Sequence, residues 1–187
     1  MIDRVRSITM VDFSFSKEFV RLAESGQLNW TIEAHRDGYT IWHPASLTYL
    51  IEKDGEEYRL GRFERTNPPA FNFFATDLKL IERRVIAAMC ADYRQIAHLP
   101  RFDVYRMARS IKEGFAPHKL DEYYYTLRDT KTGQLYPMRV FEGSNMPLEP
   151  TYLSHIVTVP IKDLFEAYMA PDGAPLFSDF IYKRPQE

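Results

Sequence analysis

Cysteine is nearly absent from this chain of 187 residues, because Cys90 is its single cysteine. One cysteine excludes an internal disulfide and any metal site built from several thiolates. Cys90 lies in the middle of an alanine-rich helical pattern, whereas reactive thiols favour helix N-termini or cationic surroundings, so we interpret it as a packing residue. The histidines are scattered and show no pair at the spacing of a zinc-binding helix; they are His35, His43, His98, His118 and His155. We therefore expect no metal and no cofactor.

Glycine and long apolar runs are also scarce, and basic residues do not outnumber acidic ones. Eight glycines are spread among turns, and neither G-x-x-x-x-G-K nor G-x-G-x-x-G occurs, so a phosphate-cradling nucleotide loop has no support. Lys and Arg number 24 against 26 Asp and Glu, which argues against nucleic acid as a partner because phosphates need clustered basic residues. No apolar run approaches the roughly 20 residues of a membrane span, and the charged N-terminal stretch does not resemble a signal peptide. We expect a cytoplasmic protein without a membrane partner.

The apolar residues that are present suffice for a folded core. Hydrophobic residues make up 45% of the chain and aromatic residues 14%, a content that disordered chains lack. A chain of this length favours one domain, 1–187, over two independent ones.

Apolar periodicity predicts helices and hairpins in alternation. Ser14 or Ser16 can cap a short helix, and Asp37-Gly38 and Asp54-Gly55 predict tight turns between antiparallel strands. The longest helix begins after Thr76 or Asp77, and its apolar residues recur every three or four positions. The second half repeats this order loosely, with helical patterns over 104–111, 153–157 and 160–169 and strands over 123–127 and 135–141. The prediction is an α/β fold of the α+β kind, with antiparallel meanders packed against helices. A helix–hairpin–helix pseudo-repeat over 14–99 and 103–177 is a further hypothesis.

Charged hairpin tips and a tyrosine are the candidates for contact with a partner. Asp54, Glu56 and Glu57 surround the second hairpin turn, and the turn over 129–133 is similar in character. Tyr124 lies on the opposite strand face from Tyr123 and Tyr125, and an exposed tyrosine suits a protein interface. Arg65 belongs to the densest charge cluster, where a salt bridge to the long helix is our first interpretation and partner contact the second. The run Phe71, Phe73 and Phe74 is expected to plug the junction between sheet and helix.

Two stretches of the chain resemble the immunity protein 61 family. The first covers residues 61–94 and reads GRFERTNPPAFNFFATDLKLIERRVIAAMCADYR. The second combines YLSHIV at 152–157 with IKDLFEAYMAPDGAPLF at 161–177. In order, the matching features cover most of the chain from Trp30 to Phe177. The chain departs from the family pattern in its tyrosine-rich hairpin over 123–141 and at Ala91-Asp92, where a glycine is expected.

The resemblance implies an antitoxin that binds a secreted toxin domain and covers its active site. In the family's immunity factor of the tuberculosis necrotizing toxin, the blocked toxin hydrolyses NAD, so an NAD glycohydrolase is the implied target. Such a protein needs no catalytic residues. Two alternatives stay open: a small enzyme with a dispersed site built from Glu64, Arg65 and His155, and a protein-interaction or dimerisation module.

Overall fold

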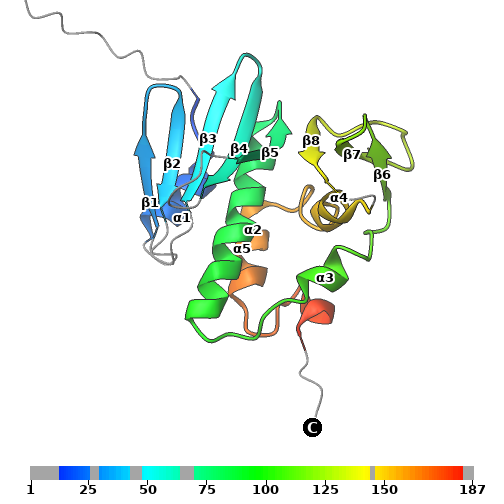
Figure 1. Ribbon diagram of the computed structural model, residues 1–187. Helices are drawn as coiled ribbons and strands as arrows, with labels where there is room; N and C mark the ends of the chain where they lie inside the picture. The colour runs from blue at the N-terminus through cyan, green and yellow to red at the C-terminus, as the bar shows by residue number, and fades with distance from the viewer. Residues whose placement is uncertain (1–12, 26–29, 43–47, 64–69, 144–145, 183–187) are drawn as a thin grey trace, which may run out of the picture.

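The computed structural model describes residues 13–25, 30–42, 48–63, 70–143 and 146–182, and Figure 1 shows their arrangement. The elements follow in chain order: α1 (Lys17–Glu24), β1 (Thr31–Ala34), β2 (Gly38–Trp42), β3 (Thr48–Asp54), β4 (Glu57–Phe63), β5 (Ala70–Ala75), α2 (Leu78–Ile96), α3 (Val104–Met107), β6 (Phe115–Lys119), β7 (Tyr124–Asp129), β8 (Met138–Phe141), α4 (Leu148–Leu153), α5 (Ile161–Met169) and the short 3-10 helix η1 (Ser178–Phe180).

The long helix α2 forms where its sequence predicts it. Asp77 caps the first turn, since its carboxylate accepts a hydrogen bond from the Lys79 amide at 2.9 Å. The apolar stripe is fully buried at Ile81, Val85 and Met89, and it reaches the surface at the end of the helix, where Ile96 is exposed. Cys90 is also buried, and burial raises the pKa of its thiol, as expected for a packing cysteine.

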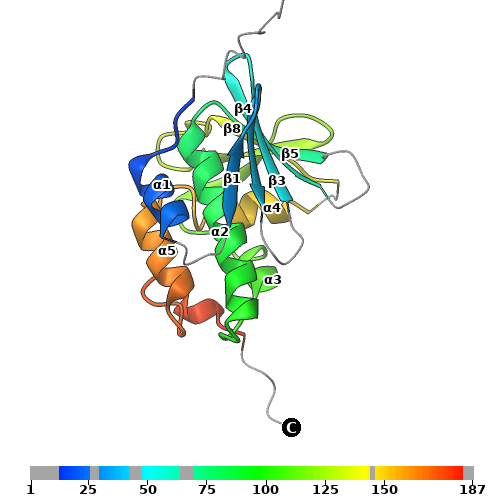
Figure 2. The same ribbon diagram turned by 90° about the vertical axis from the view of Figure 1, so that its left-hand side faces the viewer.

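The strands form one eight-stranded antiparallel sheet in the order β1-β2-β3-β4-β5-β8-β7-β6. Two meanders, β1 to β5 and β6 to β8, are joined where β5 pairs with β8. Helices α1, α2 and α5 lie together on one side of the first meander, as Figure 2 shows. Helix α4 packs against β6 and β7 in the second. The predicted α/β class with antiparallel meanders is confirmed.

Several predicted elements differ from those observed. The aromatic run is not a plug but strand β5, in which Phe73 enters the core while Phe71 and Phe74 stay half-buried on the other face. A register shift between Leu60 and Gly61 places Phe71 and Phe74 on one face despite their odd spacing. Strand β6 escapes prediction because Pro117 lies at its centre. The predicted helix over 104–111 ends at Met107, and α4 begins at Leu148, earlier than predicted.

The predicted cap of the first helix is confirmed at one of the two serines. The Ser16 hydroxyl accepts a hydrogen bond from the Phe19 amide at 3.2 Å, and Phe19 is fully buried. Glu64 and Arg65 lie outside the described residues.

Candidate functional site

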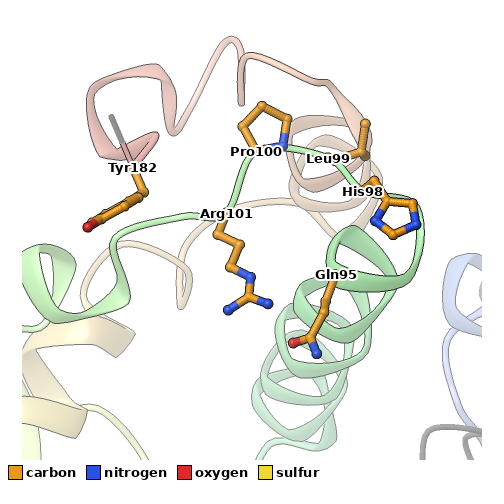
Figure 3. Close-up of a pocket in the computed structure, with 6 residues that line it drawn as sticks. All are labelled: Gln95, His98, Leu99, Pro100, Arg101 and Tyr182. Carbon is orange, nitrogen blue, oxygen red and sulfur yellow. The ribbon is translucent and has the colours of Figure 1, made fainter. Parts of the chain in front are cut away.

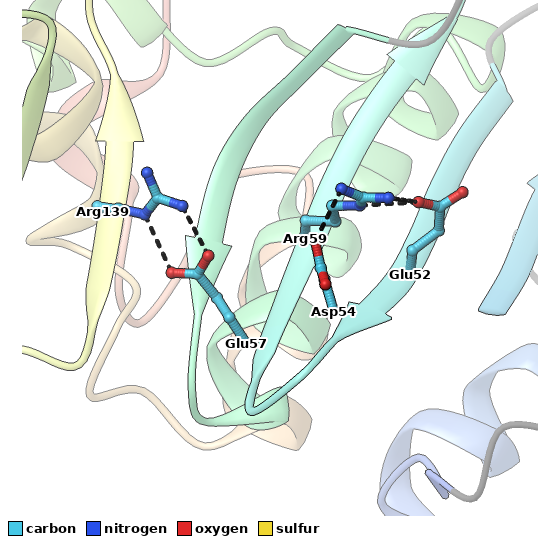
Figure 4. A network of polar contacts seen from close by, with 5 residues as sticks. All are labelled: Glu52, Asp54, Glu57, Arg59 and Arg139. Atoms are coloured by element: carbon cyan, nitrogen blue, oxygen red, sulfur yellow. Dashed lines mark hydrogen bonds and ion pairs between the residues drawn. The ribbon is translucent and has the colours of Figure 1, made fainter. Parts of the chain in front are cut away.

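One face of the sheet carries the polar residues that the fold brings together. Antiparallel partners share a face, and Ile51, Leu60, Phe73 and Val140 pair in succession across β3, β4, β5 and β8 and are all buried. The neighbour of each of these residues in its strand points to the opposite face of the sheet, and these neighbours form a second row. This row consists of Glu52, Arg59, Phe74 and Arg139. Figure 4 shows the two arginines and their acidic neighbours on the side of the sheet turned away from α2. We call this surface the open face, made of Glu52, Asp54, Glu57, Arg59, Phe71, Phe74, Tyr124, Arg139 and Phe141.

The first polar cluster of the open face is centred on Arg59. Its Nε donates a hydrogen bond to Glu52 at 2.7 Å, and a second guanidinium nitrogen lies 3.3 Å from an oxygen of Asp54. The guanidinium also lies over the ring of Phe71, 4.5 Å from its centroid. Contacts with two carboxylates and one ring fix the orientation of the guanidinium plane.

The second polar cluster is centred on Arg139. Two of its nitrogens donate to the two oxygens of Glu57, at 3.0 and 2.7 Å, so the pair is bidentate. The guanidinium lies 4.2 Å from the ring centroid of Phe74 and 4.9 Å from that of Tyr124. Hydrogen bonding to Glu57 raises the pKa of Arg139. Because Glu57 lies on β4 and Arg139 on β8, this pair crosses strand β5 and joins the two meanders.

Aromatic rings continue the surface beyond Arg139. The ring of Tyr124 meets those of Phe74 and Phe141 edge to face, with centroids 5.8 and 5.9 Å apart. Tyr123 stacks on Phe141, and both of these side chains are about half exposed. Arginine and large aromatics held in fixed positions are the residue types that dominate the energetics of protein interfaces.

The structure brings together three of the five residues predicted for partner contact. Asp54, Glu57 and Tyr124 belong to the open face, and Glu56 is exposed in the turn between β3 and β4. Arg65 lies outside the described residues. Glu57 follows the turn directly, and its pairing with Arg139 leaves its side chain half-buried.

Sequence reasoning missed the two arginines at the centres of the clusters. Arg59 and Arg139 are separated in the chain by helices α2 and α3 and by three strands, and the strand pairing places them on one row. Alternation within each strand assigns a face to each residue, but it does not reveal which strands are neighbours.

Of the three residues of the alternative enzyme site, only His155 lies within the described residues. His155 is half-buried, and its Nε2 lies 2.5 Å from the carbonyl oxygen of Ser110. Burial lowers the pKa of His155, and its ring packs against Phe180. Within the described ranges there is no group of three or more His, Cys, Asp or Glu placed to hold a metal ion.

A hollow of about 630 Å³ lies at the C-terminal end of α2, apart from the open face. It is lined by Gln95, His98, Leu99, Pro100, Arg101 and Tyr182. Figure 3 shows the side chains of Gln95 and Arg101 reaching toward the same space, whereas the ring of His98 points elsewhere. The helices of the described parts include none that is long and apolar enough to cross a membrane.

Fold and surface together define a mixed α/β protein whose sheet is covered by helices on one face and carries arginine–aromatic clusters on the other. The model of the immunity protein 61 family matches residues 22–176, and the chain belongs to this family. The solved structure of Rv3902c from M. tuberculosis has the same fold, with a TM-score of 0.73 and 14% sequence identity over 92% of this chain and 98% of that chain. No curated protein matches the sequence.

Proposed function

We propose that this chain is a cytoplasmic immunity protein that binds a cognate bacterial toxin domain and covers the toxin's active site. Membership of the immunity protein 61 family supports an antitoxin role and a protein toxin as the partner. The observation that carries the binding role is the open face, where two guanidinium groups are each fixed by carboxylates and aromatic rings.

A preorganised surface of this kind suits an inhibitor. Tight protein complexes bury roughly 800 Å² on each partner, and a few arginine and aromatic side chains supply most of the binding energy. Side chains that are already held in place lose little conformational freedom when a partner binds. An inhibitor acts by binding alone and therefore requires no catalytic group.

The proposed target is a toxin that hydrolyses NAD, as the resemblance implies for this family. The experiment uses the purified chain and the toxin domain encoded beside its gene. Binding is measured by calorimetry, and toxin activity is followed as NAD consumption at increasing ratios of the chain to the toxin.

We expect inhibition to be complete at one chain per toxin domain and to persist in excess NAD. If one molecule of the chain inactivated many toxin molecules, the protein would be an enzyme rather than a stoichiometric inhibitor. If the chain bound its toxin but the toxin did not consume NAD, the antitoxin role would stand and the NAD target would be wrong. Failure to bind the toxin, together with self-association in solution, would favour a dimerisation module.

A further inference from the structure

We propose that the open face and the adjoining β3–β4 turn dock into a cationic cleft, the kind of cleft with which a toxin binds an anionic, phosphate-bearing substrate. This inference rests on the proposed function and adds the surface and the chemistry of the partner. The partner is the mouth of the toxin's active site, where carboxylates of this chain occupy positions that substrate phosphates would otherwise take.

The charge of the surface supports a cationic partner. Glu52, Asp54 and Glu57 lie on the open face, and Glu56 is exposed in the adjoining turn. Three of these four carboxylates contact two guanidinium groups, those of Arg59 and Arg139. Lys53 is also at the hairpin end, but its amine lies over the ring of Tyr58, on the opposite face of the strand. The chain as a whole has a formal charge of only −2, so the acidic excess is concentrated at this surface.

The carboxylates differ in how firmly they are held. Glu57 uses both oxygens on Arg139, and Glu52 is only 21% exposed beside Arg59. The side chain of Asp54 is 72% exposed and meets Arg59 through one oxygen at 3.3 Å, and Glu56 is exposed in the turn. Asp54 and Glu56 are therefore the carboxylates available to a cation of the partner.

The same charge pattern argues against two other occupants. Nucleic acid would bring phosphates toward an acidic surface, which is repulsive. A second copy of this chain would bring like charges together across a twofold axis, where residues meet their own equivalents. A cleft built to bind phosphates has the opposite sign, because it presents Arg, Lys or amide donors to its substrate.

The two parts of the surface are expected to act on different rate constants. Exposed charges steer encounter and change the association rate, with a strong dependence on salt. Groups that become desolvated in the complex change the dissociation rate. Asp54 and Glu56 should therefore control association, while Arg139 and the rings around it should control dissociation.

The test measures both rate constants against the cognate toxin domain, at low and at high salt, for the double variant D54R/E56R and the single variant R139M. We expect D54R/E56R to associate at least about tenfold more slowly at low salt, with a smaller effect at high salt. R139M should dissociate about 10- to 100-fold faster. The double variant E18R/E24R on α1 is the matched charge control, since it reverses the same number of charges and both residues are exposed on a helix on the covered side of the sheet.

If R139M does not fold, two alanine variants still test whether the open face controls dissociation. Phe141 is 46% exposed on the open face, and Tyr182 is 53% exposed at the distant hollow, so Phe141→Ala should accelerate dissociation and Tyr182→Ala should not. Wild-type kinetics for folded D54R/E56R and Phe141→Ala would overturn this inference while leaving inhibition by the wild-type chain intact. Failure of the wild-type chain to bind would instead refute the proposed function.

Discussion

Replacing Arg94 by methionine is expected to destabilise the protein more than any change on the open face. Arg94 is 1% exposed, although it carries a charge and lies near the end of α2. Its guanidinium donates to the carbonyl oxygens of Tyr168 at 2.6 Å, Ala170 at 2.7 Å and Pro171 at 3.0 Å. It also donates to Pro100, with Nε at 2.8 Å, and lies over the ring of Phe102 at 4.1 Å.

The magnitude follows from the four carbonyl groups that would lose their donor. Each buried polar group without a partner costs about 1–3 kcal/mol, and removing the buried guanidinium charge offsets part of that sum. The net loss should be about 3–5 kcal/mol of unfolding free energy. For a chain of this size, that corresponds to roughly 10 °C in Tm. Burial lowers the pKa of Arg94, but a guanidinium stays protonated at any pH where proteins fold, so the loss should not depend on pH between 6 and 9.

The assay is urea unfolding followed by circular dichroism, with Arg94→Lys as the control. A lysine keeps the charge and three donors but cannot reproduce the planar fork, so it should recover about half of the loss. A loss below about 1 kcal/mol for Arg94→Met would show that water or relaxed backbone satisfies these carbonyls, and would refute the reasoning.

Three further predictions concern buried positions. Burial raises the pKa of Glu82 above its ordinary value of 4.5, although its Oε1 accepts a hydrogen bond from the Ser16 amide at 2.5 Å. The stabilising contribution of Glu82 is therefore present below pH 4.5 and is lost as the pH rises. Glu82→Gln should make the urea midpoint fall less between pH 5 and 8, and an equal fall in both proteins would contradict this prediction. Cys90 should react with a thiol reagent only when the protein unfolds, so a labelling rate independent of urea would show that the thiol is accessible in the native state. Gly38→Ala should destabilise the protein by more than about 2 kcal/mol in thermal unfolding, because the Cβ of the new alanine would lie 1.9 Å from the carbonyl oxygen of Ile51. An unchanged Tm in the variant would show that β2 and β3 can move apart to make room.

The sequence was most informative where the structural signal is local. The cap at Asp77 and the apolar stripe of α2 are set by residues within a few helical turns. The Asp54-Gly55 turn joins the two strands of a hairpin, and Gly55 has the positive φ of +62° that such a turn needs. Strand β5 lacks such a signal, since its aromatics fall on both faces and the bulge beside Leu60 breaks the alternation.

The candidate site was predictable only in part because its residues come together through long-range pairing. Asp54 and Glu57 flank a turn that composition reveals, which is why sequence reasoning found them. Their partners Arg59 and Arg139 depend on β4, β5 and β8 being neighbours, and the pairing of β5 with β8 joins segments separated by α2, α3 and two strands. No periodicity within a short window carries that information.

Helix α2 of the first stretch that resembles the immunity protein 61 family packs against α5 of the second stretch and against the segments that precede α5. Arg94 of the first stretch donates to carbonyl groups at the end of α5, which belongs to the second. Arg83 donates to the carbonyl oxygen of Val159 at 2.6 Å, and Arg84 pairs with Glu149 at 2.7 Å.

These contacts attach α2 to the C-terminal segments, and α2 in turn covers the inner face of the sheet. The helices of the two family-like stretches thus build the support. The open face lies on the other side of the sheet, where Phe71 and Phe74 of the first stretch belong to it. Substitutions in the support should lower stability and leave the toxin affinity of the folded protein unchanged. Substitutions on the open face that spare the Glu57–Arg139 pair should do the reverse, because this pair links β4 to β8 across β5 and so helps to hold the two meanders together.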